Sequence, residues 1–337
     1  MADKVARTAC MELNYRGVDL AGNCVRAEYI DHAQGAQDEL TATLEDRDQR
    51  WQGSWMPAKG DQVAAAILCR DWFAPGDSWR LDCGAFEIGE ITLNGPPDMV
   101  EIRATSTKVS RSARTQKKTK PWEDVSLMHI AGAVADKAGL ALHWEGNDRH
   151  YERVDQREES DLAFLRRLAL DTGNSVKPVD EKLIVYAGRD WDARPASASL
   201  VRGQDGIRTY RFRTASHDLY RGCVCTYWHP DLKEYLTGEF MPPGAPPTGE
   251  LIRVNQPVKD LAEARELARN TLRKKNRVEV NCDLELMGDP RRRATQVLAL
   301  SGWGYFDGHY FVDQCRHSLD GQGGMVTNLD LRKVLDY

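Results

Sequence analysis

Two stretches far apart in the chain share one pattern of strand, glycine-containing turn and strand. Residues 84–88 (GAFEI) resemble residues 308–312 (GHYFV), and each stretch resumes after its turn at a Met-Val pair. Upstream, segments that begin at Gly60 and Ala294 share a Gln-Val pair. Strands carry little sequence information, so the alternative is a chance similarity, whereas a genuine repeat predicts two related β barrels. The residues at matching places are Phe86 and Tyr310, Met99 and Met325, and Val100 and Val326.

The texture of the sequence divides the chain into three parts. Short β-like runs broken by turns of Pro and Gly occupy residues 9–107 and return from residue 200, and an α+β segment lies between them. The 337 residues are enough for several domains with cores of their own. We therefore predict a mainly β fold with α+β insertions, which comprises two related antiparallel β-barrel domains and an α+β insert. The predicted limits are 1–110 for the first barrel, 111–195 for the insert and 196–337 for the second barrel, with a loop and helix inserted at about 230–277.

Three helices are predicted from apolar periodicity and from signals at their ends. The first has Leu127, Ile130, Ala131, Val134 and Ala138 on one face and is closed by Gly139. The second lies within residues 155–173, is capped by Ser160 and closed by Gly173, and has Leu162, Leu165, Leu168 and Ala169 on one face. The third runs from Asp260 to about Lys275, with Asp260 and Glu263 as a capping pair and Leu261, Ala264, Ala268 and Leu272 as its buried stripe. Residues 140–144 predict a strand, residues 174–188 a hairpin, and residues 240–250 an irregular loop of Pro and Gly.

The overall charge argues against two classes of partner. The formal net charge of −5 offers no general attraction to nucleic acid or to an anionic membrane. No apolar run approaches the roughly 18 residues of a membrane span, and the N-terminal segment lacks the apolar core of a signal peptide, so we expect synthesis in a cytoplasm. The basic residues 108–121 predict a solvated connection rather than a phosphate-binding patch, because no aromatic side chains alternate with the cations.

The residue types that usually perform catalysis form no recognisable constellation. Of the eight cysteines, Cys223 and Cys225 alone lie close together, on one face of a predicted strand, which favours packed, reduced thiols over a metal site or a disulfide. His309 and His317 flank the last predicted hairpin without a convergent carboxylate, which favours structural roles. Three arginines after Asp289 are typical of a solvated turn, with a charged interface patch as the alternative. We therefore predict no catalytic, cofactor-binding or metal-binding residues, no cofactor and no enzyme activity.

Four segments of the chain resemble a known family. Residues 156–169 (QREESDLAFLRRLA) are similar to the Q-x-x-E-S-D-x-x-F-L-x-R-L-A signature of phage late control gene D proteins. These proteins are the baseplate hubs of contractile tails and are related to the hub portion of type VI secretion spikes. Residues 43–51 resemble an early segment of the family, and residues 59–67 (KGDQVAAAI) resemble its Gly-led strand. Residues 307–335 resemble its closing hairpin and last strand. The matching positions of the closing pattern are Gly308, Tyr310, Val312, His317, Gly324 and Thr327.

The resemblance implies a fold, an assembly and a set of partners. It implies a homotrimer in which two barrels per chain make six similar units around a channel, so that one ring can meet a sixfold tail tube and a threefold spike. The expected partners are a tail spike protein below, a tail tube or tube-initiator protein above, other baseplate proteins and a tape measure protein, with neither sequence-specific nucleic acid nor membrane insertion of its own. The expected place is the tail baseplate of a virion or of a phage-like bacteriocin, assembled in the bacterial cytoplasm. In this family context Glu159, Ser160 and Asp161 are expected to hold the start of a bracing helix and not to catalyse a reaction.

Two departures from the family shape the alternatives. The sequence stops at Tyr337, after the last barrel strand, so we expect the needle of fused type VI spikes to be supplied by a separate protein. No stretch resembles a lysozyme, so we expect any cell-wall hydrolase to be a separate polypeptide too. The alternative functions are a hub from a split type VI spike and a cell-wall hydrolase. Composition does not distinguish the loops that would face the tube from those that would face the spike.

Overall fold

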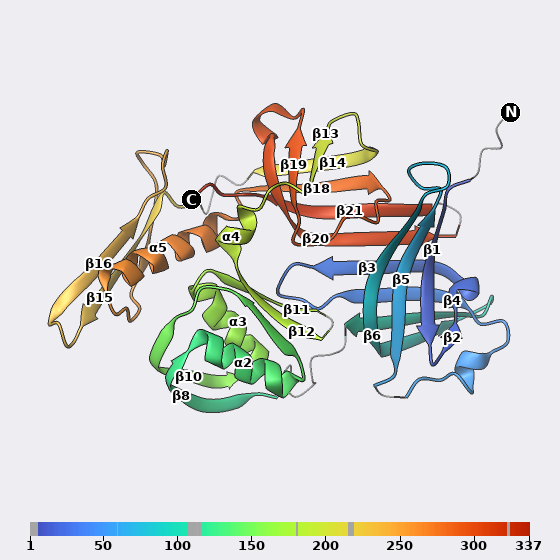
Figure 1. Ribbon diagram of the computed structural model, residues 1–337, viewed down its shortest axis with the longest axis horizontal. Coiled ribbons are helices and arrows are strands. Elements are labelled where there is room, and N and C mark those ends of the chain that lie inside the picture. The colour runs from blue at the N-terminus through green and yellow to red at the C-terminus, as the bar shows by residue number, and fades with distance from the viewer. Residues whose placement is uncertain are drawn as a thin grey trace.

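The structure is a computed structural model that describes residues 6–58, 60–106, 113, 116–179, 181–214, 219–321 and 324–337. Its largest feature is one curled sheet of 13 strands within that described part (Figure 1). The hydrogen-bonded order is β14-β18-β21-β20-β3-β4-β7-β6-β5-β1-β2, with β19 on β20 and β13 on β19. The first half of the sheet contains β1 (Thr8–Tyr15), β2 (Val18–Asp19), β3 (Cys24–His32), β4 (Glu39–Glu45), β5 (Gln62–Arg70), β6 (Ser78–Asn94) and β7 (Met99–Ser106). The second half contains β13 (Ala198–Val201), β14 (Ile207–Thr214), β18 (Val280–Met287), β19 (Val297–Ser301), β20 (Gly308–Asp320) and β21 (Gly324–Lys333).

Each half of the sheet buries its own core. In β4, alternate residues Leu40, Ala42 and Leu44 are buried while their neighbours are partly exposed, which is the period-two pattern of a strand with one covered face. The first core gathers around Phe86 and Trp51, and the second around Tyr310 and Leu329. Short 3-10 turns lie at Ala21–Asn23, Arg50–Gln52 and Gly304–Phe306. The predicted mainly β class is confirmed, although the two halves form one continuous sheet and not two separate barrels.

The two halves repeat the same strand order. Neighbouring strands run β3-β4-β7-β6-β5-β1 in the first half and β14-β18-β21-β20-β19-β13 in the second. Both central strands carry a bulge at the same place, after Ile88 in β6 and after Val312 in β20. The outermost pair differs, because β1 runs antiparallel to β5 whereas β13 runs parallel to β19.

The α+β part lies below the second half of the sheet (Figure 1). Two helices, α2 (Leu127–Ala138) and α3 (Asp161–Asp171), pack between a strand ribbon and a three-stranded sheet. The ribbon pairs β8 (Lys118–Ser126) with β10 (His150–Glu159), and the sheet has the order β11-β12-β9. The strands of that sheet are β9 (Ala141–Glu145), β11 (Asn174–Val179) and β12 (Lys182–Ala187), and the short helix α4 (Gly188–Asp192) leads out of it.

Most local predictions for this part are confirmed. The predicted hairpin is β11–β12, and Gly139 and Gly173 have the positive φ values of left-handed helix ends, 75° and 74°. Two predictions are wrong in detail. No strand was predicted before the Ser160 cap, but His150–Glu159 forms strand β10, and the end of the predicted basic connection, from Lys118, starts strand β8. Residues 108–112, 114 and 115 of that connection lie outside the described residues.

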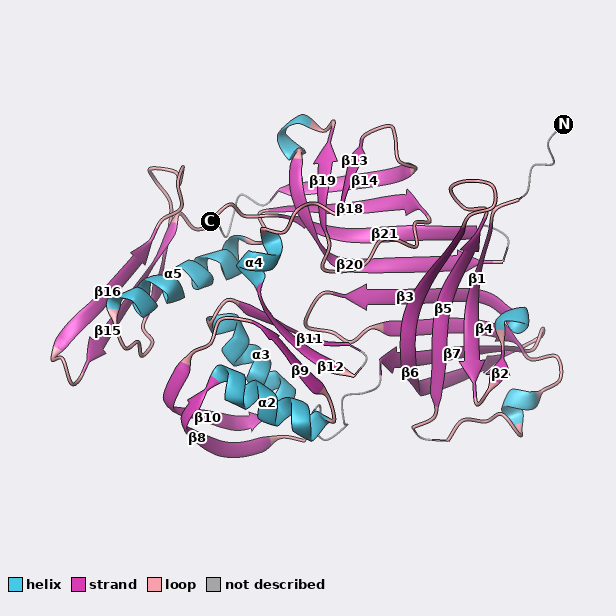
Figure 2. Cartoon of the chain, in the orientation of Figure 1, coloured by secondary structure: helices cyan, strands magenta, loops and turns pink. Residues whose placement is uncertain are grey.

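A third layered unit projects at the left of Figure 2. Helix α5 (Leu261–Asn276) lies on a sheet of β15 (Gly222–His229), β16 (Glu234–Phe240) and β17 (Leu251–Val254). The irregular loop predicted at residues 240–250 separates β16 from β17. The predicted capping pair is present, since Asp260 accepts the N–H of Glu263 at 2.8 Å, but Leu261 is 40% exposed and does not join the buried stripe. Strand β15, which precedes the predicted insertion, pairs with strands of that insertion.

Candidate functional site, a junction between two sheet repeats

The two repeats are joined edge to edge by β20 and β3. After its pairing with β19 ends, β20 continues and pairs antiparallel with β3 from Gln314 opposite His32 to Asp320 opposite Arg26. On the covered face, the rings of Tyr29 and His317 stack with centroids 6.3 Å apart and planes 9° from parallel. A pairing of two strand edges satisfies backbone groups that each edge would otherwise expose. The junction is therefore both a hydrogen-bonded seam and part of the core.

Two polar contacts beneath the sheet, both with residues of the second half, fix the ring of His317 at this seam. Its Nδ1 lies 3.0 Å from Thr327 Oγ1, and its Nε2 lies 3.0 Å from the carbonyl oxygen of Arg292. The carbonyl can only accept, so Nε2 carries the proton and Nδ1 accepts from the threonine hydroxyl. Thr327 Oγ1 in turn accepts the N–H of Asp289 at 2.9 Å. Burial lowers the pKa of His317 to about 4, so the ring is neutral and structural, as predicted. His309 lies exposed at the other end of β20, and the structure does not bring the two histidines together.

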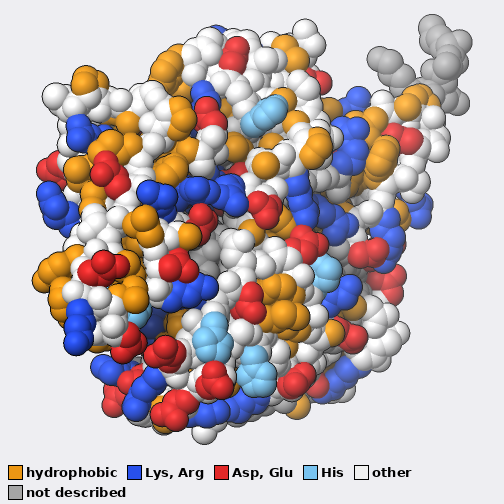
Figure 3. Space-filling view, turned by 60° about the vertical axis from the view of Figure 1, so that its left-hand side comes forward, with side chains coloured by type: hydrophobic (Ala, Val, Ile, Leu, Met, Phe, Trp, Pro, Cys, Tyr) orange, Lys and Arg blue, Asp and Glu red, His pale blue; other side chains and the backbone are white. Residues whose placement is uncertain are grey.

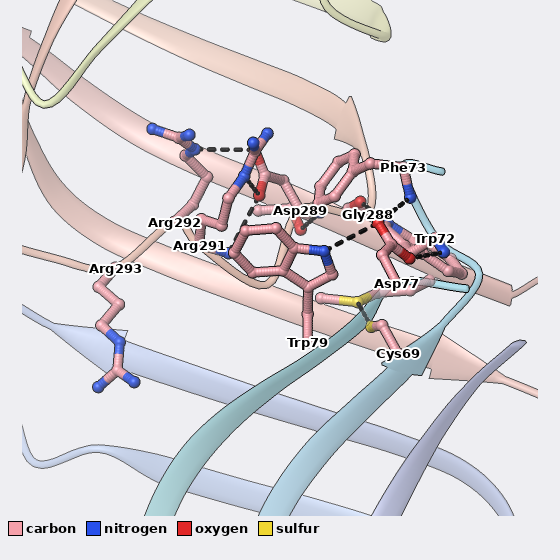
Figure 4. Close-up of polar contacts among 12 residues, drawn as sticks. Cys69, Trp72, Phe73, Asp77, Trp79, Gly288, Asp289, Arg291, Arg292 and Arg293 are labelled. Carbon is pink, nitrogen blue, oxygen red and sulfur yellow. Dashed lines mark hydrogen bonds and ion pairs between the residues drawn. The ribbon is translucent and has the colours of Figure 1, made fainter. Parts of the chain in front are cut away.

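A second contact between the halves lies above the seam (Figure 4). The loop after β5 inserts Trp72, whose indole N–H donates to the carbonyl oxygen of Gly288 in the second half. Asp77 shapes that loop by accepting the N–H groups of Phe73 and Ala74, each at 3.0 Å. In the core beneath, Cys69 Sγ lies 3.7 Å from Met325 Sδ.

One of the three predicted arginines, Arg291, takes part in this second contact. Arg291 and Arg292 both bind the carboxylate of Asp289, at 2.8 and 2.9 Å. The guanidinium of Arg291 also lies 4.0 Å from the ring centroid of Phe73, a cation–π contact between the two halves. Arg293 extends away from this cluster (Figure 4). The interpretation of a charged interface patch therefore describes Arg291 better than that of a solvated turn, although the interface lies within the chain.

The α+β part is anchored to both halves by buried polar contacts. Lys177 of β11 forms an ion pair with Asp31 of β3, and the hydroxyl of Tyr186 donates to the carbonyl oxygen of Ala33 at 3.1 Å. At the end of α4, Asp192 binds Arg332 of β21 at 2.6 Å and Arg273 of α5 at 2.8 Å. These contacts hold the α+β part against both halves of the large sheet, next to the β20–β3 junction.

The family signature at the start of α3 forms a local brace. Ser160 Oγ accepts the N–H of Ala163 at 3.3 Å, the capping contact that its type and place predicted. Glu159 binds Arg167 at 2.9 Å, and the buried Asp161 binds Lys118 and Lys137. Glu159, Ser160 and Asp161 are thus all used in contacts within the α+β part.

The groups that could hold a metal ion do not converge. Among the described residues, no three side chains of His, Cys, Asp or Glu lie together as a metal site would need. Cys223 and Cys225 are buried and reduced, and burial raises the pKa of Cys223 to about 11, which keeps its thiol protonated. No helix in the described part of the chain is long and apolar enough to cross a membrane. On the face shown in Figure 3, basic and acidic side chains are mixed.

The sheet repeats leave two edges open. Within the described part of the chain, β14 pairs with β18 alone, and residues 89–94 of β6 pair with β7 alone. Both edges carry large apolar side chains in water: Leu93 is 47% exposed and Tyr210 is 41% exposed. Sequence reasoning missed these edges, because strand pairing cannot be read from the texture of a single strand.

Comparison with known proteins identifies relatives among phage baseplates. No family model matches the chain. Over 197 residues the chain is 27% identical to the probable baseplate hub protein of Escherichia phage 186, and over 200 residues it is 30% identical to that of Escherichia phage P2. Each match covers 57% of this chain and 48% of the relative, so the chain spans about half the length of the curated relatives that it matches.

Solved structures share the fold over nearly the whole chain. A tail protein from Neisseria meningitidis MC58 superposes with a TM-score of 0.71 at 14% identity, covering 97% of each chain. The 43 kDa tail protein of prophage MuSo2 from Shewanella oneidensis gives 0.70 at 11% identity, covering 96% of this chain and 98% of that one. The E. coli c3393 protein, a component of the type VI secretion system, gives 0.61 at 9% identity, covering 96% and 77%. The chain is therefore similar in sequence to probable baseplate hub proteins of phages, and it shares its fold with phage tail proteins.

Proposed function

We propose that the protein is the structural hub of a contractile-tail baseplate, a threefold ring around a central channel that joins the tail tube to the spike. The relatives named as baseplate hub proteins and the tail-protein fold support the general role. We also propose the domain limits of 1–110, 111–195 and 196–337, with the insertion at about 230–277.

One observation carries the threefold ring: the two halves repeat one strand order and are already joined edge to edge. A head-to-tail contact between copies closes into a ring when its rotation divides the circle. Three chains with two repeats each present six similar units, so one face can meet a sixfold tube. The parts that occur once per chain, such as the α+β insert, occur three times and can meet a threefold spike.

The role is one of assembly and not of catalysis. Its partners are a spike protein, a tube or tube-initiator protein, other baseplate proteins and a tape measure protein, and its place is the tail of a virion or of a headless bacteriocin. Three polar side chains of the signature, Glu159, Ser160 and Asp161, are occupied by contacts inside the chain, which supports this role.

The oligomeric state and the shape of the purified protein test the proposal. We expect a trimer by sedimentation velocity at micromolar concentration, and rings with a central hole in negative-stain electron micrographs. A stable monomer that forms no ring under these conditions would contradict the proposal. Zymography on peptidoglycan tests the catalytic alternative, and clearing by the purified chain would show a hydrolase.

The likeness to a type VI secretion component favours one second candidate, the hub of a split type VI spike. Neighbouring genes distinguish the two. Tape-measure and tail-tube genes would indicate a phage or bacteriocin, whereas genes for a secretion ATPase and a membrane complex would indicate type VI secretion.

A further inference from the structure

We infer that the open segment of β6 pairs antiparallel with β14 of a second copy of this chain, with Leu93 opposite Phe212 and Thr92 opposite Arg213. This inference deepens the proposed ring and rests on it, because it names the strands and the register that join one chain to the next. The β20–β3 seam inside the chain is the template for this seam between chains.

The register of the two repeats can be matched through the shared bulge. In the first half, one row of paired residues crosses four strands through Ile88, Ala104, Leu40 and Tyr29. In the second half, the row that starts at the same side of the bulge passes through Val312, Leu331, Cys282 and Phe212. All eight side chains are buried or partly buried in the two cores. Phe212 of β14 therefore corresponds to Tyr29 of β3.

The same match identifies the partner of Phe212. Inside the chain, Tyr29 lies opposite His317, which is five residues beyond Val312 on β20. Five residues beyond Ile88, and likewise past the bulge, lies Leu93 on β6. If the seam between chains repeats the seam within the chain, Leu93 of one copy faces Phe212 of the next. The neighbouring pairs are then Thr92 with Arg213 and Ile91 with Thr214.

Burial supports this assignment. At the internal seam, Tyr29 is 5% exposed and His317 is fully buried. At the corresponding open edges, Leu93 and Tyr210 are the large apolar side chains in water. Tyr210 precedes Phe212 by two residues and shares its face of β14, so Leu93 would lie opposite Phe212 and diagonally beside Tyr210. A single added strand would thus remove exposed apolar surface and satisfy two open backbone edges.

The charges on the outer face are compatible with this pairing. β14 presents the exposed Arg211 and Arg213 on its outer face. β6 presents Thr92, which lies beside Glu101 of β7 in the sheet. Within the chain Arg213 binds Asp283 of β18, and in the proposed seam it faces the uncharged Thr92. The internal seam instead pairs opposite charges on its outer face, where Arg316 lies 4.0 Å from Glu28. The arginines lie on opposite strands of the two seams. They lie on β14, which corresponds to β3, in the seam between chains, and on β20 in the seam within the chain.

Cysteine cross-linking tests the register. The double variant Thr92→Cys, Arg213→Cys, in a Cys10→Ser background that removes the exposed native thiol, places two thiols directly opposite each other across the seam. Opposed residues of antiparallel strands have Cα atoms roughly 4.5–5.5 Å apart, within the reach of a disulfide. We expect mild oxidation to yield a covalent trimer on a non-reducing gel. Each single variant should give no covalent species beyond a dimer.

A second double variant is the matched control. Thr92→Cys with Arg211→Cys keeps both thiols on the outer face but places them two residues out of register, at roughly 7–8 Å, where a disulfide strains to form. If this pair cross-links as well as the first while sedimentation still shows a trimer, the register is wrong and the proposed hub stands. If neither pair cross-links in a trimer, the two strands do not form the seam. A chain that remains monomeric overturns both the seam and the ring.

A charge at the edge gives an independent readout. Leu93→Asp places a carboxylate where the seam would bury an apolar side chain, so we expect the trimer to dissociate while the monomer keeps its unfolding transition. Val18→Asp, on the edge strand β2 of the same half, is the control, because Val18 is also partly exposed, at 38%, but lies outside the seam. A Leu93→Asp variant that assembles as the wild type does would overturn the inference.

Discussion

At corresponding places of the two repeats stand an imidazole, His317, and an aliphatic side chain, Leu93. The internal seam is formed once, during folding, and can bury a polar ring whose nitrogens are both bonded, to Thr327 and to the carbonyl of Arg292. The structural role of His317 could be predicted from sequence, because no carboxylate accompanied it in a catalytic pattern. Its two partners could not, because they come from a neighbouring strand and from a loop 25 residues away.

The burial of His317 predicts a pH dependence of stability. The pKa of the ring is about 4 in the folded chain and about 6.5 in the unfolded chain, so the unfolded state binds more protons between these values. The contribution is therefore complete above pH 6.5 and is lost as the pH falls toward 4, by up to about 3 kcal/mol. We expect urea unfolding at pH 7.5, 6 and 5 to show this loss, and His317→Asn to be less stable at pH 7.5 but flatter across the range. Equal slopes for both proteins would count against the assignment.

At the scale of elements, helices were predicted better than strands. Ser160, Asp260, Gly139 and Gly173 mark helix ends through local chemistry, and each was found in its expected place. Strand β10 was missed at residues 155–159 because its outward side chains are charged and mimic the acidic start of a helix. The repeat was recognised from its glycines and aromatics, but its Met-Val pairs do not align in the structure. When Ile88 is matched with Val312, the strand pairing matches Met99 with Val326, one residue away from Met325. The turns between the paired strands differ in length, so letters alone misalign them.

A close contact between elements makes Gly238 sensitive to substitution. Strand β16 and helix α5 approach so closely that a Cβ on Gly238 would lie 2.4 Å from the carbonyl carbon of Ala264. We expect Gly238→Ala to lower the free energy of unfolding by about 1–3 kcal/mol, because backbone and not a flexible side chain must move. Hydrogen exchange of the α5 amides should accelerate. Gly22→Ala, whose Cβ would meet open space, is the control and should leave both measurements unchanged.

At the scale of the whole molecule, the parts are tied by contacts between residues distant in sequence. Asp192 ends the α+β part and binds arginines of α5 and of the last strand, Arg273 and Arg332. The order of the parts along the chain could be predicted from texture, but these contacts could not, since nothing local marks a carboxylate for a partner 140 residues away. The open edges were hidden from sequence for the same reason.

The loss of Asp192 should loosen the union of the parts. Asp192→Ala leaves Arg332 and Arg273, with side chains 8% and 12% exposed, without their common carboxylate. We expect a loss of about 3–5 kcal/mol in the free energy of unfolding by urea, as for other buried charges deprived of a partner. Asp190→Ala, on the same helix but with its side chain 66% exposed, should change stability by less than about 1 kcal/mol. Similar losses of the free energy of unfolding in both variants would contradict the prediction that the buried ion pairs of Asp192 stabilise the fold more than the exposed pair of Asp190.

The fusion of two sheet repeats in one polypeptide has a consequence for how a hub could evolve. In a ring of the proposed kind, every second seam lies within one chain. The pairing of its strands does not depend on protein concentration, whereas the pairing at a seam between chains does. The covalent link also frees the two copies to diverge, and His317 beside Leu93 is one trace of that freedom. The wall of such a ring would have six similar sheet repeats. Insertions that occur once per chain, such as the α+β part, would occur three times on it, because each chain contributes two repeats and one copy of each insertion.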